Sequence, residues 1–591
     1  MVAPQNLPSL LRAGLILPSE DSQDDEFVFA HTLLQEAAYA SLLRHERREL
    51  HQAVGEVLEA SYPERGEDLA PVLAEHFLHS RNPARALDHL CRAGKAADRL
   101  FAVDEASGHF ARAFDLLNPT TSDRDRVEEV ALGLGRALEL QNRFADALRV
   151  YDWMEAAGRQ RPDDALRLAA LVARAKVLGT PNPAQDPARA EQALEEALDL
   201  AHRLGDVASE SRILWNRMIA RVYSGGDVGD AIRMGQASLA LARRHGLTEQ
   251  MAFTLNDLAY GYTALDDPTS ALEAQTEAEG LWRSLGNWPM LADCLATSVV
   301  SHHMLGELSK ARTASEEALA ISRKIGNLWG QANSQLYRSY VDFDAGRPDL
   351  AFQAAEQTAG LGSQAGHVVA AFVASADRAW MAACLGDVEG GLRRILQLLQ
   401  APPPMPERLI IPHALGILGR IRVRAGDLIG AREAFDQALT IMPDEGLRLM
   451  APFALPVGRA ELALAERRPE EGLAVLDTYL TYLEAHRGRV FLPEALFLRG
   501  RLFAVKDGLA AAHGDLQEAL RMAEEEGILR LVGPVASWLG QVCDAVDRPQ
   551  EAAAFRSRGR EAYQAIASHI PQASLRRSFL ATPEVRDVVK G

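Results

Sequence analysis

The sequence predicts an all-α protein, a solenoid of helix hairpins that repeat about every 40 residues. Three observations support this prediction. The 591 residues are 48% apolar but only 6% aromatic, a composition dominated by residues that form helices well. Glycines that can end helices recur at a fixed interval. Between them, apolar residues recur every three or four positions, as on one face of a helix.

Two sets of turn residues mark the 40-residue interval. The first set recurs about every 40 residues and comprises Gly205, Gly246, Gly286, Gly326 and Gly366. The second set falls halfway between, at the same interval, and comprises Gly226, Asp266, Gly306, Gly346, Gly386 and Gly426. Glycine followed by Asp or Asn can end one helix in the left-handed conformation and cap the next. Each repeat is therefore expected to contain two helices of about four turns.

Small residues follow the second set of turns and would let two helices approach closely: Ala231, Ala271, Ala311, Ala351, Gly391 and Ala431. Toward the C-terminus "ERRPEEGLAVL" and "AVDRPQEAAAF" keep the expected phase, whereas "KDGLAAAHGDLQEAL" is slightly displaced. The proline-rich stretches "GTPNPAQDP" and "APPPMPER" predict longer loops inside the array. About ten to twelve hairpins are expected.

The pattern resembles the tetratricopeptide-like repeat in its longer variant. The resemblance extends from about residue 65 to residue 567. It implies a right-handed α-solenoid whose groove holds peptides, proteins or small effectors. We therefore expect a repeat domain over residues 61–567 and a C-terminal tail over residues 568–591.

The first 60 residues follow a different pattern. "SLLRAGLIL" predicts a short helix that runs into a strand, and "EFVFAH" predicts a second strand beyond the acidic turn "PSEDSQDD". This order is what the back half of a winged helix would show. Two amphipathic helices follow, so residues 1–60 are predicted to be a partial winged helix with linker helices.

A second resemblance covers this N-terminal segment. "FVFAHTLLQEAAYASLLRHERRELHQAVGEVLE" is similar to the junction after the nucleotide-binding module of signal-transduction ATPases with numerous domains, above all bacterial cyclase–ATPase–repeat proteins. The family pattern falls on Phe29, His31, Gln35, Glu36, Tyr39, Arg47 and His51. "SLRRSFLATPEVRDVV" resembles the tail that closes such arrays. The resemblance implies the sensor part of such a protein, beginning within its winged helix.

The catalytic motifs of that family are missing from the sequence. A phosphate-binding loop needs Gly, four residues, then Gly-Lys-Ser/Thr. The only Gly-Lys pair, Gly94-Lys95, has His89 in place of the first glycine and Ala96 in place of the hydroxyl residue. No strand-rich region could house a cyclase domain. We therefore expect no enzyme activity and no cofactor.

Histidine pairs give no clear metal site in the sequence. His45 and His51 are six residues apart, which places them on different helix faces. His76 and His79 share a helix turn but have no evident third ligand, and His302 is predicted to be a structural residue on the packing face. No metal site is expected.

Charge and cysteine content limit the partners. The net charge of −18 weighs against a nucleic-acid binder, which normally has a basic face. No apolar run is long enough to cross a membrane, and no export signal is visible. The four cysteines have no paired spacing and fit reduced core residues. The expected location is the cytoplasm, without nucleic-acid or membrane binding.

Three positions on the first helix of each hairpin vary in type and form one stripe, since they are three and four residues apart. They hold Ile213, Phe253, Asp293, Asn333 and Val373; then Arg217, Asp257, Thr297, Tyr337 and Asp377; then Ala220, Tyr260, Val300, Tyr340 and Trp380. Aromatic and polar side chains together suit a recognition groove. The alternative is ordinary packing between repeats. The predicted binding residues are Arg217, Asp257, Tyr260, Asp293, Asn333, Tyr337, Tyr340, Asp377 and Trp380.

Two functional hypotheses follow. In the first, the chain is a non-catalytic sensor whose groove binds a peptide, protein or small effector and so regulates a signalling ATPase or cyclase in a partner chain. In the second, it is a free-standing scaffold that holds proteins together. The regulatory coupling is implied by the family resemblance.

Overall fold

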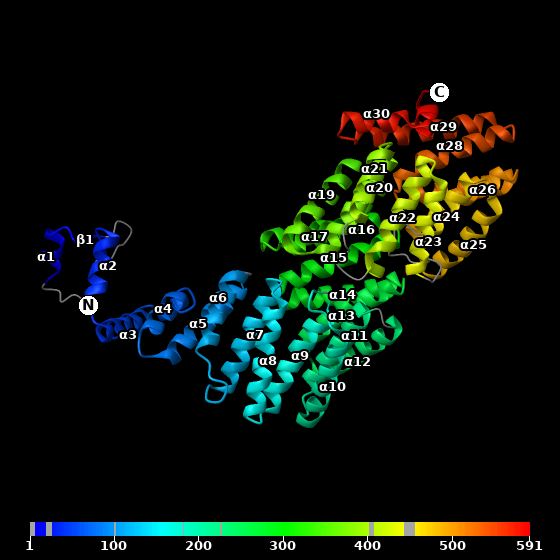
Figure 1. Ribbon diagram of the computed structural model, residues 1–591. Coiled ribbons are helices and arrows are strands. Elements are labelled where there is room, and N and C mark those ends of the chain that lie inside the picture. Colours follow the sequence, from blue (N-terminus) through cyan, green and yellow to red (C-terminus); the bar gives the residue numbers. More distant parts are fainter. Residues whose placement is uncertain are drawn as a thin grey trace. The chain divides into compact units, whose positions relative to one another are not determined.

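The computed structural model describes residues 6–18, 27–99, 102–180, 182–224, 227–400, 407–442 and 455–590. These residues are almost entirely helical and pack as consecutive hairpins, which confirms the predicted all-α, tetratricopeptide-like solenoid (Figure 1). The chain forms two compact units, residues 1–177 and residues 178–591. Among the described helices, none is both long enough and apolar enough to cross a membrane.

The first unit begins with a short helix and a two-stranded sheet and continues as helix hairpins. Its elements are α1 (Leu7–Arg12), β1 (Ile16–Pro18), β2 (Phe27–Phe29), α2 (Thr32–Ser41), α3 (Arg44–Ser61), η1 (Pro63–Arg65), α4 (Ala70–His79), α5 (Pro83–Arg99), α6 (Val103–Asp115), α7 (Arg124–Leu140), α8 (Phe144–Gln160) and α9 (Asp164–Gly179).

The predicted order of helix, strand, strand and helix is confirmed at the start of this unit. The strands pair antiparallel, with Ile16 opposite Phe29 and Pro18 opposite Phe27. Residues 19–26, which hold most of the expected acidic turn, lie outside the described residues. The assignment of these elements to a winged helix stays a prediction, as do the domain limits at residues 60 and 567.

The Gly94-Lys95 pair has a packing role in the first unit. Gly94 is buried in the middle of α5, and a Cβ there would lie 2.9 Å from the Phe110 ring. Gly133 in α7 approaches the same ring from another helix, at 2.7 Å. The glycine therefore allows close contact between helices and does not open a phosphate-binding loop.

The described residues of the second unit form consecutive helix hairpins. Its elements are α10 (Pro187–Leu204), α11 (Val207–Ser224), α12 (Val228–His245), α13 (Thr248–Ala264), α14 (Pro268–Leu285), α15 (Trp288–Met304), α16 (Leu308–Lys324), α17 (Leu328–Leu336), α18 (Arg338–Asp344), α19 (Pro348–Ala365), α20 (Val368–Cys384), α21 (Val388–Gln400), α22 (Glu407–Ala425), α23 (Leu428–Ile441), α24 (Leu455–Ala465), α25 (Pro469–Ala485), η2 (Arg489–Phe491), α26 (Leu492–Val505), α27 (Leu509–Glu525), α28 (Leu529–Ala545), α29 (Pro549–Ser568), α30 (Ala573–Ala581) and α31 (Pro583–Lys590).

The turn residues adopt the expected left-handed conformation. Gly205, Gly246, Gly286, Gly326 and Gly366 have φ between 65° and 72°, and Asp266 holds φ 57° in the second set. Gly226 lies outside the described residues. The small residues after the second set are buried, in agreement with the predicted close approach of two helices. We call the second-set turns hairpin turns, since each joins the first and second helix of one hairpin, and the first-set turns repeat turns.

The interval continues toward the C-terminus on residues other than glycine. Left-handed residues recur at an even spacing, at Arg467, Arg487, Asp507, Gly527 and Asp547. The predicted displacement of "KDGLAAAHGDLQEAL" is therefore wrong, because Asp507 falls midway between the hairpin turns at Arg467 and Asp547. The loop predicted in "GTPNPAQDP" lies between α9 and α10, and residues 401–406 of "APPPMPER" lie outside the described residues.

The second unit folds back on itself. Four successive hairpin turns, at residues 266, 306, 346 and 386, contact segments much later in the chain, at residues 482–489, 526–530 and 578–582. We call this contact the fold-back interface. It brings α18 against α28 and α15 against η2.

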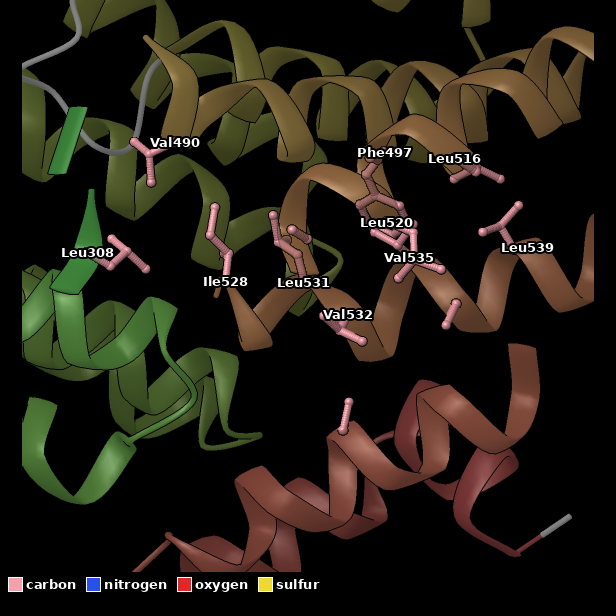
Figure 2. Close-up of a cluster of buried hydrophobic side chains, with 14 of the residues drawn as sticks. Leu308, Val490, Phe497, Leu516, Leu520, Ile528, Leu531, Val532, Val535 and Leu539 are labelled. Atoms are coloured by element: carbon pink, nitrogen blue, oxygen red, sulfur yellow. The ribbon is translucent and has the colours of Figure 1, made fainter. Parts of the chain in front are cut away.

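An apolar cluster lies behind the fold-back interface. Leu308 of α16 and Val341 of α18 belong to the same buried cluster as Val490, Ile528 and Leu531 (Figure 2). Apolar side chains from repeats far apart in the sequence therefore share one core. Burial of apolar surface is the main stabilising contribution to such a contact.

Candidate functional site

Eight of the nine predicted binding residues lie on the first helices of the second unit, from α11 to α20, and Tyr337 lies at the break between α17 and α18. We call the helix face that carries them the inner stripe. At its N-terminal end Arg217 lies 2.9 Å from Glu191 Oε1, and Asp257 accepts a hydrogen bond of 2.7 Å from the Trp215 indole. Both side chains keep part of their surface exposed.

Tyr260, Asp293 and Tyr337 lie near one another in the middle of the inner stripe. Asp293 accepts hydrogen bonds from the amides of Asn256 (3.1 Å) and Asn333 (3.0 Å). Burial raises the pKa of Asp293 although these two bonds oppose the shift. The structure thus brings together carboxylate, amide and phenol groups from successive first helices.

Three tyrosines lie within electrostatic range of one another there: Tyr223, Tyr260 and Tyr337. Burial raises the pKa of Tyr337 to about 12, with a further contribution from Asp377. It also raises the pKa of Tyr260 well above its ordinary value, and Asp293 adds to the shift. A phenol is protonated at neutral pH even at its ordinary pKa, so all three tyrosines can donate hydrogen bonds. Each keeps part of its surface exposed.

The C-terminal members of the stripe are buried. Tyr340, Asp377 and Trp380 are 7%, 0% and 3% exposed, and Asn333 is 4% exposed. His413 Nε2 lies 2.9 Å from Asp377 Oδ1. These side chains pack between repeats, which is the alternative that the sequence left open.

Beyond Trp380 the stripe continues as a network of ion pairs. The Trp380 ring lies under the guanidinium groups of Arg420 and Arg424, at 4.2 and 4.3 Å from its centre. Arg420 donates two hydrogen bonds of 2.8 Å to Glu461 and one of 2.6 Å to Glu494. Arginine is suited to such bidentate contacts because its donors are planar.

This network of ion pairs extends to the fold-back interface. Arg530 lies 3.1 Å from Glu494 and donates a bond of 2.7 Å to Asp344, whose other oxygen lies 2.8 Å from His303 Nε2. Burial alone would raise the pKa of Glu494, but Arg530 and Arg420 outweigh it and lower the pKa to about 2. Burial would likewise raise the pKa of Asp344, but Arg530 and His303 outweigh it and lower the pKa.

Several of these residues were missed from sequence although the repeat interval points to them. His413 and Arg420 lie one interval after Val373 and Trp380, and Glu461 continues the series at nearly the same interval. The prediction ended at α20 because the proline-rich stretch interrupts the pattern. Tyr223 lies one helix turn beyond the three positions that were compared.

His302 is not the buried histidine that the sequence predicted. His303 is the buried residue, at 7% exposure, and lies against Asp344. His302 is partly exposed and lies 2.7 Å from Glu307 Oε2. The predicted structural role therefore belongs to the neighbouring histidine.

Three histidines meet in the first unit. His51 Nδ1 lies 3.0 Å from His76 Nδ1, Tyr39 Oη lies 3.0 Å from His51 Nε2, and the rings of His51 and His79 are 5.1 Å apart. Burial lowers the pKa of His51, and the nearby histidines add to this shift. The sequence showed no third residue beside His76 and His79, and the structure places His51 next to both. Arg47 lies over the Tyr39 ring at 4.9 Å, so part of the family pattern forms one contact group.

Comparison with known proteins gives similarity at the level of the fold. No protein-family model and no curated protein matches the chain. A solved Rap protein complexed with competence and sporulation factor is similar, with 13% identity and a TM-score of 0.30 over 82% of this chain and 99% of that one. Yeast Tom70 shares 14% identity, with a TM-score of 0.33 over 85% and 99%.

A third similar structure is a signal-transduction ATPase with numerous domains and a tetratricopeptide repeat sensor, from Pyrococcus horikoshii. It shares 13% identity with a TM-score of 0.41, over 76% of this chain and 60% of that one. These similarities extend to the helical-repeat fold and to nothing finer. Ligand binding by the nine residues stays a prediction.

Proposed function

We propose that the protein is a non-catalytic sensor and interaction module that binds a peptide, a protein segment or a small effector on its inner stripe. The observation that supports this best is the group formed by Tyr223, Tyr260, Tyr337, Asp257 and Asp293, all partly exposed. Phenol groups donate and carboxylates accept, so this surface matches a ligand with both kinds of group, such as a peptide backbone.

The fold-back interface supports a role in signalling. The hairpin turns at residues 266 and 306 end the same first helices, α13 and α15, that carry Tyr260 and Asp293. A ligand that separated or rotated these helices would also move the turns on which the C-terminal repeats dock. The binding surface and the fold-back interface are therefore mechanically linked.

By the resemblance of the N-terminal segment, the target of this signal is an ATPase or a cyclase of the signal-transduction type. In this proposal the repeats sense the ligand and the catalytic domain responds. A free-standing scaffold is the second candidate, favoured by the burial of Asn333, Tyr340, Asp377 and Trp380 within the array.

The test is affinity capture with the full chain as bait in a lysate of the source cells, with ATP or with ADP. The variant carries Tyr223→Phe, Tyr260→Phe and Tyr337→Phe, which removes three hydroxyl groups and keeps the ring volumes. The control is Tyr62→Phe in the first unit, where the side chain is exposed. We expect the triple variant to lose at least tenfold of the captured partner and the control to lose none.

Dependence on nucleotide separates the two candidates. An ATPase or cyclase chain recovered with only one of the two nucleotides supports the sensor. A partner recovered equally with both, yet lost in the triple variant, supports the scaffold. If the triple variant retains every partner of the wild-type chain, the inner stripe is not the binding surface.

A further inference from the structure

Three side chains of metal-binding types meet at one end of the last hairpins. His513 lies near the start of α27, Cys543 near the end of α28 and Glu551 in the first turn of α29. These helices pack in succession as antiparallel neighbours. The start of α27, the end of α28 and the start of α29 therefore lie together at one edge. One ligand atom of each residue lies within 4.8 Å of the other two.

Two members of this group are available to an ion. Within the described part of the chain, His513 Nε2 is buried and has no hydrogen-bond partner. Cys543 is a free thiol and is 0% exposed. A buried polar nitrogen without a partner is unfavourable, and most such groups in proteins have a ligand or a bond that satisfies them.

Glu551 supplies the solvent side of the group. Its side chain is 51% exposed and lies 3.7 Å from Arg548, three residues earlier. Such exposed ion pairs are weak, so the carboxylate is free to rotate toward the other two ligands. The ligands of a tetrahedral zinc ion are about 3.3–3.8 Å apart, so a small rotation of Glu551 closes the site.

We propose that His513, Cys543 and Glu551 form a binding site for Zn²⁺, with water as the fourth ligand. Nitrogen, sulfur and oxygen donors together suit zinc, whereas Mg²⁺ and Ca²⁺ require oxygen ligands. Binding forms the zinc–sulfur bond and releases the thiol proton to solvent. Because binding releases this proton, affinity rises with pH.

The ion would join α27, α28 and α29. The first residue of α28, Leu529, and its neighbour Arg530 belong to the fold-back interface. Zinc would therefore stabilise the segment that docks on the hairpin turns. This effect does not depend on ligand binding by the inner stripe.

The test uses full-length protein without a histidine tag, freed of metal with a chelator and titrated with Co²⁺ as a spectroscopic substitute for Zn²⁺. We expect one equivalent to bind and to give a sulfur-to-cobalt charge-transfer band that Zn²⁺ abolishes. Cys543→Ser should remove this band. His513→Gln and Glu551→Gln should each weaken binding at least tenfold. The matched control is Cys384→Ser, a partly exposed cysteine on α20.

Because Glu551 is exposed, the Glu551→Gln variant is expected to fold even if Cys543→Ser does not. Loss of affinity in Glu551→Gln with an unchanged circular dichroism spectrum supports the site. The absence of a charge-transfer band in the wild-type chain, or its persistence in Cys543→Ser, would overturn the proposal.

Discussion

Replacing Arg420 with methionine is expected to lower the free energy of unfolding of residues 178–591 by about 3–5 kcal/mol. The side chain is 2% exposed and donates to both Glu461 and Glu494. Its removal leaves two carboxylates in the interior with fewer partners, and a buried charge without compensation is strongly destabilising. Denaturant unfolding followed by hydrogen exchange in α22, α24 and α26 measures the loss.

Two further variants show whether the loss comes from the unpaired charges. Arg420→Met combined with Glu461→Met should recover part of the stability, because an apolar pair of similar volume replaces an ion pair. Arg521→Met removes a surface arginine that pairs with Glu518 and Glu525, and it should leave the unfolding midpoint unchanged. A loss below about 1 kcal/mol in Arg420→Met would contradict the account of the interior charges.

The same variant should change the dependence of stability on pH. In the folded protein the pKa of Glu494 is about 2, below that of a carboxyl group in the unfolded chain. The stability from this group is therefore present above about pH 4.5 and is lost as the pH falls toward 2. Without Arg420 the pKa of Glu494 rises, so stability should fall less steeply across this range.

Gly386→Ala should destabilise the protein more than Gly426→Ala, although both residues occupy hairpin turns with positive φ, at 89° and 80°. Each substitution carries the cost of a left-handed alanine, roughly 1–2 kcal/mol. Only at Gly386 would the new Cβ also meet another segment, 2.8 Å from the carbonyl group of Ser578 in α30. At Gly426 the new Cβ would meet no atom of the other described residues within 4 Å, its chain neighbours aside.

The difference between the two variants isolates the contact of α30 with the hairpin turn. We expect an additional loss of roughly 1–3 kcal/mol for Gly386→Ala, because the α30 backbone has to move. Thermal unfolding gives the stability difference, and limited proteolysis should show faster cleavage within α30 and α31. Equal losses in both variants would mean that α30 does not pack on this turn in solution.

The repeat architecture could be predicted because glycine marks most of its turns. At four later turns the left-handed residue is Arg467, Arg487, Asp507 or Asp547. Residues other than glycine adopt this conformation only at some cost in free energy, so the sequence does not mark these positions as turns. Asp266 shows what can offset that cost. Its carboxylate accepts a hydrogen bond from the Tyr482 hydroxyl across the fold-back interface.

The fold-back interface itself could not be predicted from the repeat pattern. It joins residues far apart in the chain, and its existence depends on many small angles between neighbouring helices. The position of the inner stripe could be predicted, but the side chains that its residues contact could not. The sequence places Trp380 and Arg420 in one series, yet the ion pairs of Arg420 appear only when successive first helices are packed together.

The central claim, that the second unit folds back on itself, is tested most directly by an intrachain cross-link. Arg487 Nη1 lies 3.4 Å from Thr269 Oγ1 in the fold-back interface, although the two residues are 218 positions apart in the chain. A Thr269→Cys/Arg487→Cys variant treated with a short bismaleimide should give a cross-linked peptide pair between these positions, and denaturant should abolish it. If both cysteines react with a monofunctional maleimide but no such pair forms, the second unit is an open array and the account is wrong.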